Sequence, residues 1–176
     1  MTTVFWFTGL AGAGKSTLAK LFYQDLNIYH PTLFLDGDDL REVLGSQNAY
    51  SIDERRSLAF QYARLCRMLV KQNVHVIAAT ISMFDEVRAW NLRFIENYRE
   101  IYVRAPMSVL KLRNQKNLYS NQGSNEVVGI DLPFEEPKNP DLILNNDGSM
   151  ILEEQIALLK EKFSYVYDQY KSTNFM

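Results

Sequence analysis

A glycine-rich run near the start of the chain constrains its fold more than any other feature. Residues 9–17 read GLAGAGKST, which matches the phosphate-loop pattern G-x-x-x-x-G-K-[ST]. The apolar run 4–7 precedes it and a helix-forming stretch at 17–26 follows, which is the strand–loop–helix order that the pattern requires. An ordinary glycine-rich turn is the alternative, but it does not account for a Lys-Ser pair in register after a strand. The run therefore predicts a phosphate-binding loop, with its matching positions at Gly9, Gly14, Lys15 and Ser16.

The residue types of this loop fit the chemistry of a bound nucleoside triphosphate. Successive backbone N–H groups can wrap the β-phosphate, and the N-terminus of the helix adds its partial positive charge. Lys15 can reach the β- and γ-phosphates, and the Ser16 hydroxyl can bind Mg²⁺. We therefore expect ATP and Mg²⁺ as cofactors. The expected nucleotide-binding residues of the loop are Gly9, Ala11, Gly12, Ala13, Gly14, Lys15, Ser16 and Thr17.

Length and composition fit a single soluble domain over residues 1–176. The chain is 47% hydrophobic, which is enough to bury a sizeable core. Its net charge of −2 and its pI near 5.7 disfavour nucleic acid or an anionic membrane as a partner. Cys66 is the sole cysteine, so no internal disulfide can form. The N-terminal run reads as a core strand rather than a signal peptide, and the apolar run 74–84 is too short to cross a bilayer, so we expect a cytoplasmic protein.

Short β-rich runs alternate with helical segments, as they do in parallel βαβ units. The segment 114–139 is rich in Asn, Gln, Gly and Pro, which is typical of an active-site lid, with disorder that serves no function as the alternative. The expected fold class is therefore α/β: a three-layer P-loop NTPase fold, with a mostly parallel sheet flanked by helices and a lid. Ser149 is the expected N-cap of the last helix. The predicted strands are 3–8, 32–35, 74–80, 100–103 and 142–144, and the predicted helices are 16–27, 53–72, 84–97, 106–113 and 150–170.

Two aspartates follow the second predicted strand in the run DGDDLR at 36–41. Because ligands of open parallel sheets bind at the carboxyl ends of the strands, Asp36 and Asp38 are expected beside the phosphate loop. Phosphoryl transfer to a hydroxyl needs metal support and a carboxylate that takes the proton of the alcohol. We assign Asp38 as the base or acceptor-orienting group, and Asp36 to the water shell of Mg²⁺. The alternative is a turn whose aspartates only cap the next helix.

Other P-loop classes lack support in the sequence. The third predicted strand has no aspartate at its end, so the Walker B residue of an ATPase is missing there, and no Asn-Lys-x-Asp guanine signature occurs. His30 and His75 are the sole histidines, and no Cys/His ligand cluster occurs, so both histidines are expected to be structural. These absences favour a kinase of small molecules over motor ATPases and GTPase switches.

From Val4 to about Asn146 the chain resembles the adenylylsulfate (APS) kinases. The resemblance rests on GLAGAGKST, on LDGDDLR, on Ile81-Ser82 followed by Phe84 and Arg88, on LRNQKNLY at 112–119 and on GIDLPFEEP at 129–137. It implies transfer of the γ-phosphoryl group of MgATP to the ribose 3′-hydroxyl of a 5′-nucleotide conjugate. It also implies a homodimer as a possible assembly. By the same resemblance Arg113 would lie against the ATP adenine, Lys116 would approach the phosphates, and Arg41, Ile81 and Ser82 would touch the acceptor; a solvated arginine at a helix end is the alternative for Arg113.

The departures from the family pattern concern the acceptor. Val127 and Val128 stand where the family carries Phe-Thr, and that Phe stacks on the acceptor adenine in the family. An alignment without gaps places Phe60 and Gln61 where the family has paired arginines, and a shifted helix could bring Arg55, Arg56 or Arg64 into service instead. The lid is also shorter than usual. The acceptor residues expected from the resemblance and these departures are Asp38, Arg41, Tyr50, Arg55, Ile81, Ser82, Val127 and Ile130.

Three functions are consistent with these motifs. The first is a nucleotide 3′-kinase, whose acceptor is adenylylsulfate or cytidine diphosphoramidate, the substrate of one relative and a precursor of capsule phosphoramidate groups. The second is a P-loop kinase of a non-nucleotide alcohol, which the run 129–137 disfavours. The third is a nucleotide-binding module without turnover, which the presence of Lys15, Ser16, Asp36 and Asp38 disfavours.

Overall fold

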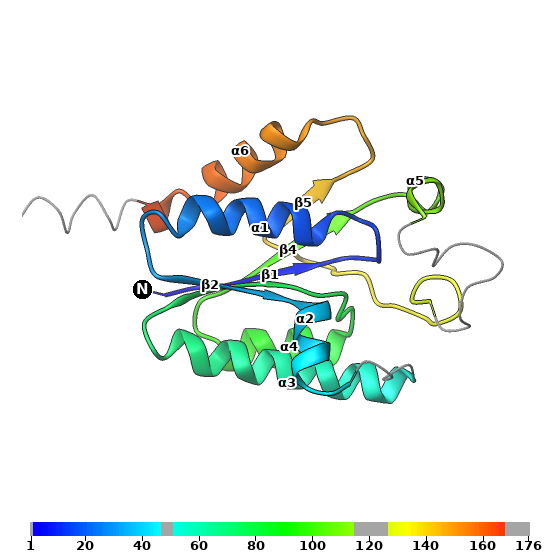
Figure 1. Ribbon diagram of the computed structural model, residues 1–176, viewed down its shortest axis with the longest axis horizontal. Helices are drawn as coiled ribbons and strands as arrows, with labels where there is room; N and C mark the ends of the chain where they lie inside the picture. Colours follow the sequence, from blue (N-terminus) through cyan, green and yellow to red (C-terminus); the bar gives the residue numbers. More distant parts are fainter. Residues whose placement is uncertain (1, 47–50, 115–126, 168–176) are drawn as a thin grey trace, which may run out of the picture.

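The computed structural model describes residues 2–46, 51–114 and 127–167, and its centre is a five-stranded parallel sheet of order β2-β3-β1-β4-β5. Figure 1 shows the sheet between two layers of helices, with α1 and α6 on one face and α2, α3 and α4 on the other. The strands are β1 (Val4–Thr8), β2 (Thr32–Asp36), β3 (His75–Ala79), β4 (Tyr98–Arg104) and β5 (Leu142–Asn145). The helices are α1 (Lys15–Leu26), α2 (Gly37–Val43), α3 (Ile52–Val70), α4 (Asp85–Phe94), α5 (Met107–Arg113) and α6 (Leu152–Lys162).

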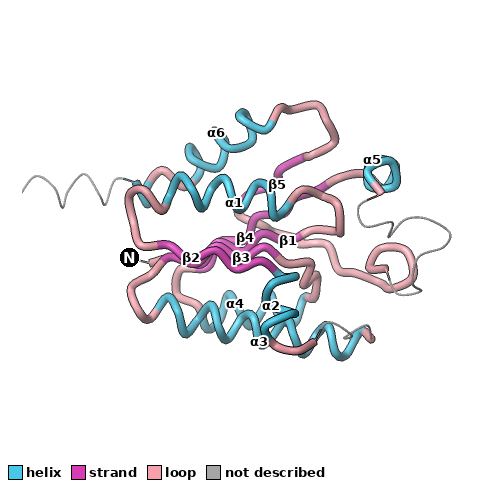
Figure 2. The backbone as a smooth tube through the Cα atoms, viewed as in Figure 1, coloured by secondary structure: helices cyan, strands magenta, loops and turns pink. Residues whose placement is uncertain are grey.

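Both faces of the sheet are buried, which explains why its central strands read as continuous apolar runs. Every residue of β1 and of β3 is buried. Because neighbouring side chains of a strand point to opposite faces, β1 supplies both halves of the core. Phe5 and Phe7 pack with α1 and α6, and Val4 and Trp6 pack with α3 and α4. Figure 2 shows the three layers that result.

The predicted fold class is confirmed, and the differences concern the ends of elements and one short helix that was not predicted. The last helix ends at Lys162 rather than at 170, since a turn at 163–164 interrupts it. The prediction that Ser149 caps it was wrong, because the Ser149 hydroxyl donates to Asp147, and Ile151 holds the N-cap position with its N–H donating to Glu154. The helix predicted at 84–97 spans Asp85–Phe94. The short helix α2 was not predicted.

The carboxyl ends of the strands meet at one edge of the sheet, on the right of Figure 1. The phosphate loop follows β1, α2 follows β2, and Ile81 and Ser82 follow β3, so the predicted site residues arrive at this edge together. Across the same edge, the Thr8 hydroxyl donates to the Ile81 carbonyl at 2.6 Å. No helix among residues 2–46, 51–114 and 127–167 is long and apolar enough to cross a membrane.

Candidate active site

The phosphate loop has the backbone shape that its glycines predict. Gly9 and Gly14 take φ angles of 146° and 96°, which side chains rarely adopt. A Cβ on Gly9 would collide with the Val103 carbonyl, and a Cβ on Gly14 would collide with the Asn146 amide. Because glycine has no Cβ, these two positions allow the loop to fold tightly between β1 and α1.

Lys15 opens α1, and its side chain is almost fully buried. Its ammonium group donates to the Leu10 carbonyl at 2.8 Å, which holds it inside the loop. Burial lowers the pKa of Lys15 from its ordinary value to about 8, although the nearby carboxylates of Asp36 and Asp38 oppose this shift. The lysine therefore lies in a poorly hydrated place, close enough to both aspartates for their charges to act on it.

The lowered pKa of Lys15 gives a pH prediction. The cation neutralises phosphate charge, and it is lost as the pH rises through about 8, so kcat/KM for MgATP should fall above that pH. Bound phosphates raise the pKa again, so kcat at saturating MgATP should stay level to higher pH. The matched control is Lys15→Arg, whose residual activity should lack this fall because arginine stays protonated. A wild-type kcat/KM for MgATP that stays level well above pH 8 would contradict the prediction.

Asp36 stands immediately before α2, and Asp38 lies on the first turn of that helix. Asp36 ends β2 and is the N-cap of α2, where its carboxylate accepts the N–H of Asp38 at 2.9 Å. The capping alternative is therefore correct for Asp36, but both aspartates also line a cleft together with Lys15 and Ser16. Capping uses one carboxylate oxygen of Asp36, and a carboxylate has a second.

The cleft extends from the phosphate loop across the strand ends to one face of α3. Arg55, Leu58 and Tyr62 line it from that helix, at the spacing of neighbours on one helical face. Phe60 and Gln61, the positions aligned with the arginine pair, do not line it. Their identity therefore says little about the acceptor. Of Arg55, Arg56 and Arg64, the three arginines that a shifted helix could bring into service, Arg55 lines the cleft.

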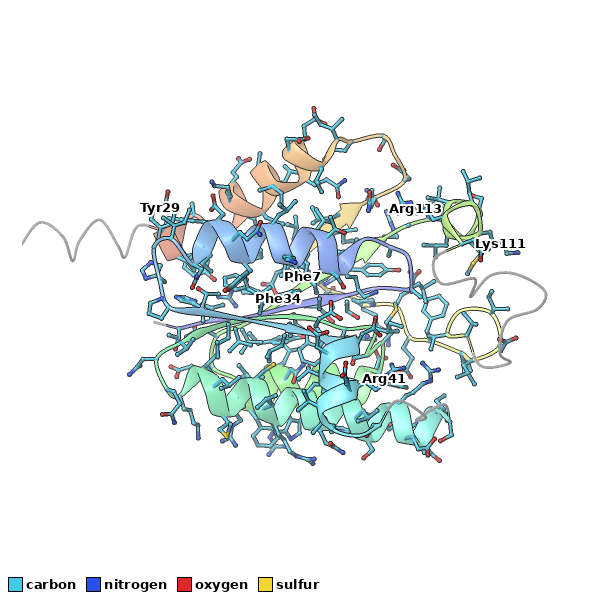
Figure 3. All side chains as sticks on the ribbon, viewed as in Figure 1. Phe7, Tyr29, Phe34, Arg41, Lys111 and Arg113 are labelled. Atoms are coloured by element: carbon cyan, nitrogen blue, oxygen red, sulfur yellow. The ribbon has the colours of Figure 1, made fainter. Side chains whose placement is uncertain are left out.

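Most of the other predicted acceptor residues that the structure describes also line the cleft. Arg41 reaches it from α2, as Figure 3 shows, and Ile81 and Ser82 follow β3 into it. Val127 lines it from the segment after the predicted lid centre, whereas Ile130 is half exposed and does not. Tyr50 lies outside the described residues.

Arg113 braces the phosphate loop from outside the cleft. It ends α5 and is exposed, and its guanidinium donates to the Gly12 carbonyl at 3.2 Å and to the Asn146 carbonyl at 3.0 Å. The Asn146 side chain donates in turn to the Ala13 carbonyl at 2.8 Å. Arg113 is thus fixed at the loop rather than free in solvent. In Figure 3, Arg113 lies above the sheet and Arg41 lies below it. Lys116, the other predicted ATP contact of this region, lies outside the described residues.

The oxygen ligands that the cleft offers fit a Mg²⁺ ion that is held mainly by the substrate phosphates. Mg²⁺ keeps several waters and binds proteins through one or two oxygen groups together with phosphates. The Ser16 hydroxyl and the Asp36 carboxylate both line the cleft and are oxygen donors of this kind. In the part of the chain that the structure describes, no cluster of three or more His, Cys, Asp or Glu residues is arranged to hold a metal ion.

Several cleft residues were missed from the sequence. Leu58 and Tyr62 carry no motif, and only the helical spacing from Arg55 would have found them. The Tyr62 hydroxyl is buried, and burial raises its pKa while the Arg41 guanidinium beside it opposes the rise. Asn146 was also missed; it directly follows β5, at the carboxyl end of a parallel strand, where ligand loops of such sheets occur.

A family model described as adenylylsulphate kinase matches residues 1–145. The chain belongs to the adenylylsulfate kinase family. A curated relative from Campylobacter jejuni, a cytidine diphosphoramidate kinase, is 39% identical over 165 residues, covering 92% of this chain and 96% of the relative. An adenylyl-sulfate kinase from Deinococcus deserti is 37% identical over 148 residues, covering 82% of each chain.

Solved structures agree with this assignment. The Mycobacterium tuberculosis APS kinase in complex with AMPPNP and APS has a TM-score of 0.81 at 28% identity, covering 93% of this chain and 98% of that one. The family and the P-loop fold predicted from the sequence are both confirmed.

Proposed function

We propose that this adenylylsulfate kinase family member transfers the γ-phosphoryl group of ATP to the ribose 3′-hydroxyl of a 5′-nucleotide conjugate. The observation that carries the proposal is the convergence of Lys15, Ser16, Asp36 and Asp38 with Arg41 and Arg55 in one cleft. Lys15, Ser16 and Asp36 suit a nucleoside triphosphate and its metal ion. The two arginines suit an anionic acceptor, because guanidinium groups bind phosphate oxygens in pairs.

The residues divide the reaction between them. Asp38 takes the proton of the acceptor 3′-hydroxyl, and the oxygen of that hydroxyl attacks the γ-phosphorus. The bond from the γ-phosphorus to the β,γ-bridging oxygen breaks, which releases ADP. Lys15 and the backbone N–H groups of the loop oppose the charge that develops on the transferred group. Ser16 and Asp36 would hold Mg²⁺, which would supply further neutralisation of the phosphate charge. Arg113 and Asn146 keep the loop in shape for the nucleotide.

For the acceptor itself we propose cytidine diphosphoramidate ahead of adenylylsulfate. Val127 and Val128 line the cleft where the family has an aromatic platform for adenine. Losing one base-stacking platform costs on the order of 1–3 kcal/mol. That is roughly tenfold to over a hundredfold in affinity. The likeness to the Campylobacter jejuni enzyme, which covers nearly all of both chains, favours the same acceptor.

A cytoplasmic location and a homodimer complete the proposal. The location is supported by the absence of a membrane-spanning helix among the described residues, and the dimer by the family resemblance alone.

An acceptor comparison tests the proposal. We expect a higher kcat/KM for cytidine diphosphoramidate than for adenylylsulfate under identical MgATP, because the valine wall offers adenine no aromatic face. Val127→Phe should shift this ratio toward adenylylsulfate by restoring a ring. The matched control is Ile130→Phe, which adds the same ring at a position outside the cleft.

Two results of this comparison count against the proposal. A higher wild-type value for adenylylsulfate would assign the chain to ordinary sulfate activation. Turnover of neither acceptor, with ATP still bound, would reject the nucleotide 3′-kinase itself.

A further inference from the structure

A buried arginine outside the cleft fastens the chain segment that forms one wall of the cleft. Arg88 lies on α4, its side chain is 7% exposed, and it does not line the cleft. Its Nη2 donates to the Glu135 carbonyl at 2.8 Å and to the carboxylate of Asp85. Arg88 and the run 129–137 both belong to the family pattern, yet none of the chemistry proposed above uses them.

The same stretch of chain is held to α4 by further bonds. The Glu135 N–H donates to the Met83 carbonyl at 3.1 Å, and the Glu135 carboxylate accepts the N–H of Asp85. Lys138 reaches the other oxygen of Asp85 at 3.1 Å. Glu135 is thus bonded through its N–H, its carbonyl and its side chain, and all three bonds lead to the start of α4 or to the residues just before it.

The fastened residues continue directly into the cleft wall. Pro133 lines the cleft two residues before Glu135, and Val127 lines it at the beginning of the described segment. Between them, Gly129 presses against the phosphate loop, where an added Cβ would lie 3.0 Å from the side chain of Leu10. The wall is therefore set between the loop on one side and the Arg88 bonds on the other.

An arginine suits this place better than a lysine. Besides Asp85 and the Glu135 carbonyl, its Nε faces the buried carboxylate of Glu100 at 3.9 Å. The planar guanidinium can serve these partners at once from fixed directions, whereas an ammonium is a single point of charge on a flexible stem. Arg88→Lys therefore keeps the buried positive charge but loses the fixed directions in which the guanidinium N–H groups donate.

We propose that Arg88 is a positioning residue for the acceptor: it fixes the segment 127–136 against the acceptor side of the cleft. Acceptor binding then depends on Arg88, and ATP binding does not, since the ATP phosphates meet the loop and α1. The inference rests on the proposed function for this division of the cleft between two substrates.

Steady-state kinetics of Arg88→Lys, with each substrate varied in turn, test the inference. The acceptor is whichever of cytidine diphosphoramidate and adenylylsulfate the wild type uses better. The acceptor KM should rise about tenfold, the typical effect of losing a hydrogen bond to a charged group, while the KM for ATP stays unchanged. The matched control is Arg99→Lys, whose guanidinium bonds Tyr165 and the Tyr98 carbonyl rather than the wall, and it should change neither KM.

The outcomes separate a positioning role from a structural one. Equal rises in both KM values, or an unchanged acceptor KM in folded Arg88→Lys, would overturn the inference. Should Arg88→Lys fail to fold, Glu135→Ala removes the exposed side of the same fastening and should give the same selective rise. An unchanged acceptor KM in that variant would then overturn the inference.

Amide hydrogen exchange distinguishes this inference from the proposed function. Without any substrate, the amides of Gly129 and Glu135 should exchange faster in Arg88→Lys than in wild type and Arg99→Lys. This result would support the fastening even if the wild type phosphorylated neither acceptor, which would reject the proposed function alone. Unchanged exchange at both amides would reject the fastening whatever the acceptor.

Discussion

Replacing Lys15 by alanine should lower kcat by at least about a hundredfold, the typical loss when a preorganised group that stabilises transition-state charge is removed. The ammonium group lies buried within the loop, where it is poorly screened by water and close to both carboxylates of the cleft. An electrostatic contribution made in such a place is larger than the same contribution in solvent. No other cation lines the cleft on the loop side among the described residues.

The Lys15→Ala protein should remain folded, because the substitution removes a desolvated charge and leaves the apolar side of α1 intact. Thermal unfolding and circular dichroism check this point. Lys20→Ala is the matched control, since Lys20 is an exposed lysine on the same helix and should leave kcat unchanged. Turnover close to wild type by folded Lys15→Ala at saturating MgATP would contradict the role of Lys15 in stabilising the transition-state charge.

The loop and the sheet could be predicted because their signals are local. Gly9 and Gly14 are needed where the backbone adopts positive φ and where other chain segments leave no room for a Cβ. The continuous apolar run of β1 reflects burial on both faces of a parallel sheet, and that arrangement sends the aspartates after β2 to the same edge. Position along the chain was therefore enough to bring Lys15 and Asp38 together.

The face that α3 presents to the cleft could not be predicted in the same way. An alignment compares residues by order, whereas a helix presents every third or fourth residue to a neighbour. Phe60 and Gln61 matched the family arginines by order, but Arg55, Leu58 and Tyr62 share the face that meets the cleft. The rotation of a helix about its axis depends on packing against the sheet, and the sequence around 60–61 carries no signal for it.

The caps of α2 and α6 show a similar limit. Asp36 was assigned to metal chemistry and also caps a short helix, and the polar Ser149 bonds within its own turn while Ile151 holds the cap position. Polar side chains near a helix start compete for several backbone partners, and tertiary contacts decide between them.

Asp38→Asn should lower kcat by about 10²–10⁴-fold, the usual loss on removing a general base, with little change in the KM for ATP. The amide keeps the size of the side chain, and the Asp38 N–H can still donate to Asp36, so the start of α2 should persist. The ability to take the 3′-hydroxyl proton is lost, together with the negative charge that opposes the lowering of the Lys15 pKa. Asp39→Asn, on the same turn but outside the cleft, is the matched control and should keep wild-type kcat.

The pattern of the two kinetic constants decides the role of Asp38. Weaker ATP binding with unchanged kcat would move Asp38 to the nucleotide side and reverse its roles with Asp36. A large loss of kcat with ATP binding intact places it on the acceptor, because an interaction made only in the transition state lowers kcat without raising KM. Direct ATP titration of the Asp38→Asn protein, alongside its turnover, separates these outcomes even when the acceptor concentration is limiting.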